Sequence, residues 1–308
     1  MVAVAQLVEP RVVISAVVGS SPIGHPIFRV LVMLVLTAGA PCLGAGEVPT
    51  LFIAGDSTAA KYNGTNPQEG WGEPMAAYFD PARLRVVNAA RGGRSSRTFV
   101  SEGHWEKMLA DVEAGDFVII QFGHNDDGAL NQEPPGSTKP LRARGTIPGI
   151  GNESEEIDNV ITGKHETVYS FGWYLRKMIA DTHAKGATPI LLTLTERNHW
   201  HEGRIDCPTD TYRSWTWQTA QSEQVAFVDL TRIIADRYQR QGPEAVNAQF
   251  GLDAVHTNLA GAEANAADVV SGLRALPGMK FRAKLSRAGR QIEADAGAST
   301  TSVCPALN

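Results

Sequence analysis

The chain has 308 residues, of which 43% are hydrophobic and 20% are charged. This composition supplies ample material for a core, and a single α/β domain of roughly two hundred residues or more is common at this length. The formal net charge of −5 gives no sign of nucleic-acid binding. We find no internal repeat and neither of the glycine-rich fingerprints that bind nucleotides. Composition therefore argues against nucleic acid as a partner and against a nucleotide cofactor.

The amino-terminal region has the pattern of a targeting segment. Arg29 precedes an apolar run over 30–40, and small residues follow through Gly46. The run matches a signal-peptide core of roughly 7–15 residues better than a membrane span of about 18 or more. We expect residues 1–46 to be a leader and the protein to be secreted or periplasmic, without membrane insertion once the leader is removed. Two alternatives stay open: a later start codon, and a lipid anchor on Cys42, against which Pro41 directly before it argues.

The rest of the chain alternates between strand-like and helix-like segments. Strand-like runs occupy Leu51–Ala54, Leu84–Ala89, Phe117–Phe122, Pro189–Leu194 and Ala226–Leu230. Helix-like segments occupy Glu73–Phe79, Ser96–Val112, Val168–Lys185, Arg213–Gln224 and Leu259–Leu276. This alternation predicts an α/β fold, a three-layer α/β/α sandwich around a central parallel sheet of about five strands.

We assign residues 47–276 to this domain, with a long loop over 127–166 that covers one edge of the sheet. Residues 277–308 mix Lys and Arg with small polar residues and predict a mobile C-terminal tail. Cys207 and Cys304 could pair in an oxidising compartment. Because the sequence gives no distance between them, we expect two unpaired thiols.

Polar, glycine-bearing loops follow three of the predicted strands. Ser57 comes directly after the first strand, and 91–97 and 123–126 follow the next two. Since the carboxyl ends of parallel strands meet at one edge of a sheet, these loops form a plausible active site. Ser57 is the candidate nucleophile there, although a serine at such a position also serves as a helix N-cap or turn residue.

A serine nucleophile needs a histidine base and an acceptor that orients the histidine. Asp253 and His256 lie three positions apart, just before a helix-like segment, so one loop can aim both at the strand ends. Gly93 and Asn125 are the candidate oxyanion donors, because a glycine N–H can approach closely and an amide donates without charge. The Ser57 N–H is a third donor, and the adjacent Gly92 is an alternative to Gly93.

These four loops resemble, in order, the four sequence blocks of the SGNH (GDSL-type) hydrolase superfamily, and most closely the rhamnogalacturonan acetylesterase family of carbohydrate esterases. The resemblance extends from Leu51 to Leu273 and includes residues 69–73, 114–119 and 193–197. It implies a flavodoxin-like SGNH hydrolase fold that needs no cofactor. It also implies roles for five residues, with a catalytic triad of Ser57, Asp253 and His256 and an oxyanion hole of Gly93 and Asn125.

The loops around Ser57 are polar, which suits a sugar better than a lipid. Arginines in these loops could pair with uronate carboxylates of a pectic chain. Alternatively, each arginine could be a solvated surface residue or part of a structural ion pair. His199 and His201 are too few for a zinc site, so we expect no metal. The residues that we expect to contact substrate are Trp71, Arg94, Arg97, His124 and His199.

The resemblance implies a secreted serine esterase that removes acetyl groups from plant cell-wall polysaccharide, with pectic rhamnogalacturonan as the first choice. The alternatives are an esterase for acetylxylan, other acyl sugars or short-chain lipids, and a non-catalytic carbohydrate-binding relative. The expected partner is an acetylated polysaccharide or oligosaccharide. The sequence leaves open which polymer and which sugar position are deacetylated, and the oligomeric state.

Overall fold

A five-stranded parallel sheet forms the centre of the protein, with the strand order β2-β1-β3-β6-β9. The structure is a computed structural model that describes residues 47–64, 67–207 and 211–307, so the predicted leader lies outside the described residues. The strands are β1 (Thr50–Gly55), β2 (Arg85–Asn88), β3 (Phe117–Gln121), β6 (Thr188–Leu192) and β9 (Ala226–Val228).

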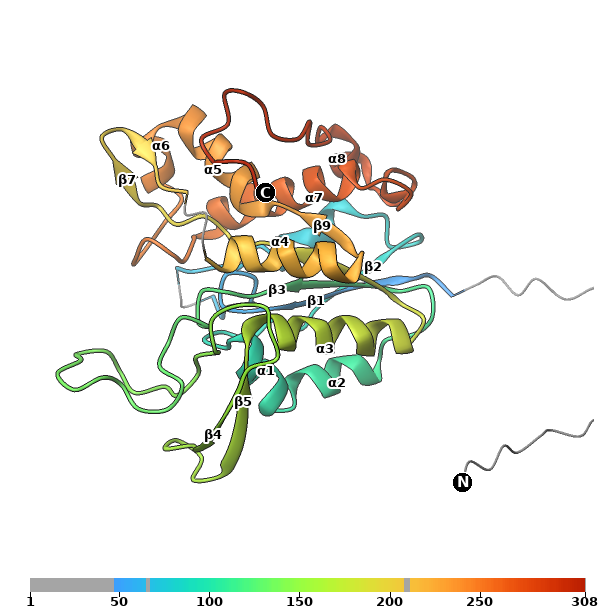
Figure 1. The fold of residues 1–308 in the computed structure, drawn as a ribbon. Helices are drawn as coiled ribbons and strands as arrows, with labels where there is room; N and C mark the ends of the chain where they lie inside the picture. The colour runs from blue at the N-terminus through green and yellow to red at the C-terminus, as the bar shows by residue number, and fades with distance from the viewer. Residues whose placement is uncertain (1–46, 65–66, 208–210, 308) are drawn as a thin grey trace, which may run out of the picture. The chain divides into compact units, whose positions relative to one another are not determined.

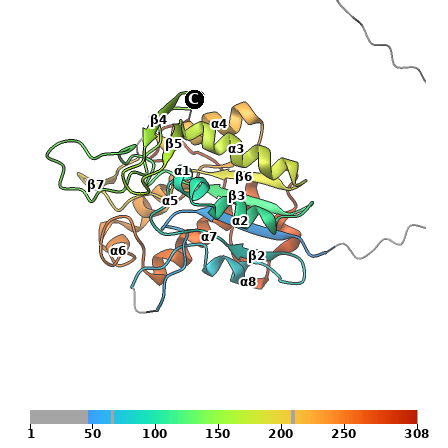
Figure 2. The ribbon, with the colours of Figure 1, turned by 90° about the horizontal axis from the view of Figure 1, so that it is seen from below.

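Helices cover both faces of this sheet, as Figures 1 and 2 show. Alternate residues of β1 point to opposite faces, and both sets are buried: Leu51 and Ile53 belong to one apolar cluster, Phe52 and Ala54 to another. The layer on the Phe52 side holds α1 (Ser96–Ser101), α2 (His104–Ala110), α3 (Phe171–Ala184) and α4 (Tyr212–Glu223). The other layer holds η1 (Pro74–Tyr78), α5 (Leu230–Gln241), α6 (Pro243–Asn247), α7 (Leu259–Ala275), η2 (Phe281–Lys284) and α8 (Arg287–Gln291). This arrangement confirms the predicted three-layer α/β/α sandwich.

The strand order determines where a ligand can bind. From β1 the chain moves outward to β2 and then crosses back to β3, so neighbouring β1 and β3 are followed by connections that run in opposite directions. In open α/β sheets this switch point leaves a crevice beyond the carboxyl ends of the two strands. The loop that carries Ser57 follows β1 and the loop that carries Asn125 follows β3, so the topology brings both loops to that crevice.

Several local predictions differ from the structure. The predicted helix over 96–112 is two helices, because Gly103 between them has a φ of +78°. The predicted loop over 127–166 contains a hairpin formed by β4 (Ser154–Asp158) and β5 (His165–Tyr169), which also takes Val168 out of the predicted helix. A second hairpin joins β7 (Trp200–His201) to β8 (Arg204–Ile205), and α5 was not predicted.

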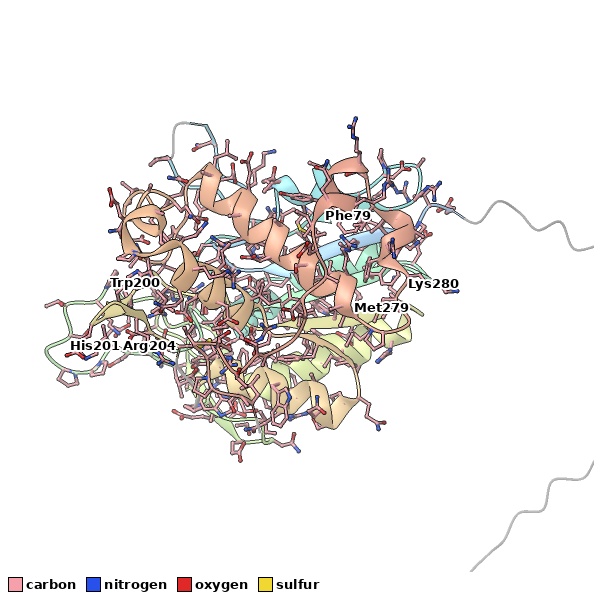
Figure 3. The ribbon with its side chains drawn as sticks, turned by 90° about the horizontal axis from the view of Figure 1, so that it is seen from above. Phe79, Trp200, His201, Arg204, Met279 and Lys280 are labelled. Carbon is pink, nitrogen blue, oxygen red and sulfur yellow. A yellow bond between two sulfur atoms is a disulfide. The ribbon has the colours of Figure 1, made fainter. Side chains whose placement is uncertain are left out.

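The C-terminal segment corrects two expectations, because it packs on the domain and is covalently attached to it. Phe281 and Leu285 are buried, and the Phe281 ring lies 4.9 Å from that of Phe117. A disulfide joins Cys207 to Cys304, with their Cα atoms 5.2 Å apart, so the two cysteines are not free thiols. Figure 3 places Phe79, Met279 and Lys280 at one end of the molecule and the β7–β8 hairpin at the other.

None of the helices in the described ranges combines the length and the apolar character that crossing a membrane requires.

Candidate active site

Ser57 lies in the turn that directly follows β1 and is nearly buried, with 6% of its surface exposed. Its neighbour Asp56 holds the turn: the Asp56 carboxylate accepts hydrogen bonds from the Thr58 N–H and hydroxyl, both at 2.8 Å. The Asp56 carbonyl accepts from the N–H groups of Ala59 and Ala60. The serine is thereby held at the end of a buried strand on a turn with little freedom.

His256 and Asp253 are aligned with this serine. The His256 Nε2 lies 2.8 Å from the Ser57 Oγ, and the His256 Nδ1 lies 2.8 Å from an Asp253 carboxylate oxygen. A carboxylate can only accept, so Nδ1 carries the proton and Nε2 is left to accept from the serine hydroxyl. The three side chains, which lie up to 199 positions apart in sequence, form one hydrogen-bonded chain.

Asp253 is held in its ionised form. Burial opposes ionisation, but hydrogen bonds from His256 and from the Val255 N–H outweigh it and lower the pKa of Asp253. An ionised acceptor at this place orients the imidazole and stabilises it when it becomes protonated.

Gly93 and Asn125 lie on two loops that are bonded to each other. The Asn125 amide donates to the Arg94 carbonyl at 2.8 Å and retains a second N–H. The Asp126 carboxylate accepts hydrogen bonds from both the N–H and the hydroxyl of Ser96, and these bonds join the same two segments a second time. Gly93 has a φ of +75°, a conformation that favours glycine. Gly92, Gly93, Asn125, Ser57 and His256 all line one groove of about 760 Å³.

Cationic side chains also line this groove, which we call the catalytic groove. Arg94 is paired with Glu102 at 2.8 Å, and Arg144 donates to the Gly93 carbonyl at 3.0 Å. Lys139 and Arg142 also line it. These groups come from the 127–166 segment that was predicted to cover this edge, apart from Arg94, and they make the groove polar.

The predicted substrate contacts are only partly at this groove. Arg94 lines it. Trp71 and Arg97 do not, because both are fully buried, and this corrects their assignment. Arg97 forms a bidentate pair with Glu166, at 2.8 Å for each bond, so its role in the structure is to fasten α1 to β5.

His124 and His199 lie beside the groove rather than in it. His124 is buried and bonded to the Thr195 hydroxyl at 3.0 Å, and burial lowers its pKa to about 4, so the ring is neutral at physiological pH. His199 is exposed and lines a second cavity. Glu196 and Arg197 also line that cavity. The sequence pattern alone gave neither residue a role, although the segment 193–197 belongs to the part of the chain that resembles the family.

Across the described residues, no three His, Cys, Asp or Glu side chains come together in a way that could hold a metal ion.

Comparisons with known proteins decide the family. The GDSL-like Lipase/Acylhydrolase family matches residues 53–264. A rhamnogalacturonan acetylesterase of Emericella nidulans is 31% identical over 212 residues, which cover 69% of this chain and 79% of the relative. This chain belongs to the GDSL-like lipase/acylhydrolase family. It is therefore a carboxylic ester hydrolase.

Two further matches agree with this assignment. A probable rhamnogalacturonan acetylesterase of Bacillus subtilis, YesY, is 31% identical over 231 residues, covering 73% of this chain and 93% of the relative. The crystal structure of the Bacillus subtilis protein YxiM superposes with a TM-score of 0.58 at 27% identity, covering 73% of this chain and 56% of that one. The chain thus spans little more than half of YxiM.

Proposed function

We propose that this protein is an exported serine esterase that removes acetyl groups from pectic rhamnogalacturonan through an acetyl-Ser57 intermediate. The observation that carries the proposal is the hydrogen-bonded chain from Asp253 through His256 to Ser57, with 2.8 Å at each step. Such an arrangement supplies the base that a serine hydroxyl needs to act as a nucleophile. Export rests on the apolar run after Arg29.

The chemistry follows from which atoms can give and take protons. His256 Nε2 accepts the Ser57 proton as Oγ attacks the acetyl carbonyl, and the imidazolium is stabilised by ionised Asp253. The oxyanion that forms is stabilised by the free N–H of the Asn125 amide and by the backbone N–H groups of Gly93 and Ser57. The imidazolium then protonates the departing sugar oxygen. In the second half, His256 deprotonates a water molecule, which attacks acetyl-Ser57 and releases acetate.

The choice of substrate rests on two supports. Two of the matched relatives are named as a rhamnogalacturonan acetylesterase and a probable one. The catalytic groove carries the cations Arg94, Lys139, Arg142 and Arg144, and a pectic chain carries carboxylates that a guanidinium matches well. Neither the relatives' names nor the charge of the groove favours a lipid.

Acetate release from a panel of polymers tests this proposal. Acetylated rhamnogalacturonan, acetylated homogalacturonan, acetylxylan and the 4-nitrophenyl acetate and octanoate esters would be compared at equal acyl concentration, with Ser57→Ala as the blank. We expect the highest kcat/KM among the polymers on acetylated rhamnogalacturonan. A clear preference for acetylxylan or for the octanoate ester would contradict the pectic substrate and leave the esterase chemistry standing. Loss of all acetate release with an intact fold would favour the non-catalytic alternative.

A further inference from the structure

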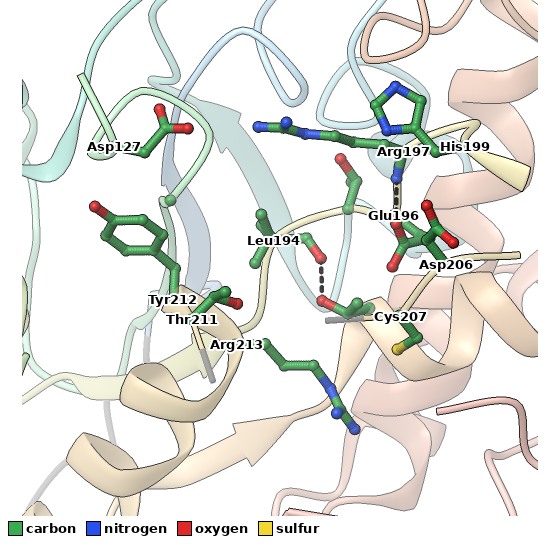
Figure 4. A pocket seen from close by; sticks show the side chains of 13 residues that line it. Asp127, Leu194, Glu196, Arg197, His199, Asp206, Cys207, Thr211, Tyr212 and Arg213 are labelled. Atoms are coloured by element: carbon green, nitrogen blue, oxygen red, sulfur yellow. Dashed lines mark hydrogen bonds between the residues drawn. The ribbon is translucent and has the colours of Figure 1, made fainter. Parts of the chain in front are cut away.

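A second cavity, of about 530 Å³, adjoins the catalytic groove at the carboxyl ends of β3 and β6. Asp127 lines both spaces, so they are neighbours. The buried His124 is bonded to the hydroxyl of Thr195, which lines the second cavity. Figure 4 shows residues that line the second cavity, among them Asp127, Leu194, Glu196, Arg197, Asp206 and Tyr212.

Arg197 provides the second cavity with a free cation. Over the described parts of the chain, its guanidinium makes neither a hydrogen bond nor an ion pair. In contrast, Arg213 in the same wall is fully buried and paired with Asp229 at 3.0 and 2.6 Å. Figure 4 shows the Arg197 side chain extending across the space toward the side that carries Asp127. A partly buried guanidinium with no protein partner is suited to a planar carboxylate, which it can bind through two parallel hydrogen bonds.

Glu196 does not neutralise this cation. Glu196 is buried, with 5% of its surface exposed, and its carboxyl accepts the Arg197 N–H at 2.7 Å, which fixes the backbone from which the guanidinium extends. Burial raises the pKa of Glu196 to about 8, and the negative charge of Asp206 adds a smaller increase. The hydrogen bond from the Arg197 N–H and the charges of Arg197 and Arg213 lower the pKa but do not outweigh burial. At neutral pH the group is therefore a protonated acid with an O–H to donate.

The remaining walls suit a polyhydroxylated ring. Asp127 and Asp206 offer carboxylate oxygens to hydroxyl donors, as is common where proteins bind sugars through charge-assisted hydrogen bonds. Leu194 and Tyr212 provide apolar surface, and the Tyr212 ring is held edge-on by Phe171 at 4.9 Å. The cavity volume lies within the range of about 300–1,000 Å³ that is typical of small-ligand sites.

We propose that the second cavity binds a uronate residue of the polysaccharide close to the acetylated position, with the carboxylate held by the Arg197 guanidinium. The proposal rests on the proposed function, because it places the acetylated sugar at Ser57. Arg197 is then a specificity-determining residue that selects acidic over neutral chains. Neutral chains leave its charge without a partner.

Inhibition of 4-nitrophenyl acetate hydrolysis tests the site without an acetylated polymer. The probes are digalacturonate and its dimethyl ester, which has the same sugar backbone, two additional methyl groups and no charge. In the wild-type protein we expect digalacturonate to inhibit roughly tenfold more strongly than the ester, the scale of one charge-assisted pair at a partly exposed site. In Arg197→Ala most of this difference should disappear, and only the contribution of the catalytic groove's cations should remain, while kcat on the aryl acetate stays unchanged.

Two control variants make the result specific. Arg282→Ala removes one exposed cation from η2, which packs near the start of β3, at the end of the sheet opposite the two cavities. This variant should keep the wild-type ratio of the two inhibition constants. Arg142→Ala removes a cation from the catalytic groove. If the preference for the charged probe survives in Arg197→Ala but disappears in Arg142→Ala, the carboxylate binds in the groove and the proposal is wrong. Equal inhibition by the two probes in the wild-type protein would also overturn it.

Arg197→Lys covers the case in which the alanine variant does not fold, which circular dichroism would reveal. Lysine keeps the charge but loses the two-pronged geometry, so the preference for digalacturonate should fall without disappearing. A wild-type ratio in Arg197→Lys would refute the assignment. Because the aryl acetate reports each result, the test remains informative even if acetylated pectin turns out not to be the substrate.

Discussion

Removal of the Cys207–Cys304 disulfide should lower the thermal stability of the protein strongly. The bond closes a loop between positions 97 apart, and the chain-entropy relation assigns a loop of that length about 4.7 kcal/mol. For a domain of this size each kcal/mol corresponds to about 2–4 °C in Tm, so the loss should be roughly 10–20 °C.

Thermal unfolding followed by circular dichroism measures this effect in Cys207→Ser, Cys304→Ser and the double variant. Because either substitution breaks the same bond, all three should lose about the same stability, and dithiothreitol should lower the Tm of the wild-type protein alone. Hydrolysis of 4-nitrophenyl acetate at 25 °C should be retained, since neither cysteine contacts the Ser57 relay. A loss of less than about 3 °C, or no response of the wild-type protein to dithiothreitol, would refute the reasoning.

Three further predictions concern the two cavities. Asn125→Ala should lower kcat by about two to three powers of ten with little change in KM, because the amide acts on the transition state; a higher KM at unchanged kcat would make it a substrate contact instead. Activity on acetylated pectin should fall as salt rises, since exposed ion pairs are screened within about 8–10 Å, and Arg142→Ala should flatten that dependence. A neutral aryl acetate should respond to neither change, and equal salt responses on both substrates would contradict the pectic assignment. Glu196→Gln should gain stability relative to wild type as pH rises from 5 to 8. The pKa of Glu196 is raised from 4.5 to about 8 in the folded state, so the folded protein keeps a proton that the unfolded chain releases, and the wild-type protein loses stability over that interval. Parallel Tm curves for the two proteins between these pH values would argue against it.

Much of the fold could be predicted because its signals are local. The runs 51–54 and 117–120 are apolar throughout, as strands buried on both faces must be, and a glycine-bearing polar loop follows soon after each. The rule that parallel strands present their carboxyl ends at one edge then brought Ser57 and Asn125 together without any knowledge of distance. The structure places them at one groove with His256.

The misassigned residues depend on contacts that sequence spacing does not contain. Arg97 ends the polar segment 91–97, which reads as a binding loop in the sequence, but it lies in α1 and its partner Glu166 is 69 positions away on a hairpin that was not predicted. Cys207 and Cys304 meet only because the tail folds back over the domain. The helix α5 had a signal, since Leu230, Ile233, Ile234 and Tyr238 recur at helical spacing, but β9 directly before it made the segment read as the end of a strand.

The most direct test of the account is mass spectrometry of the enzyme quenched during turnover of an acetyl ester. The peptide that contains Ser57 should carry the mass of one acetyl group, and this adduct should be absent in Ser57→Ala. Turnover should fall by several orders of magnitude in Ser57→Ala and in His256→Ala, and the double variant should be little worse than either, because the relay acts as a unit. Acetyl found on another residue, or near-normal turnover by Ser57→Ala, would contradict the central claim.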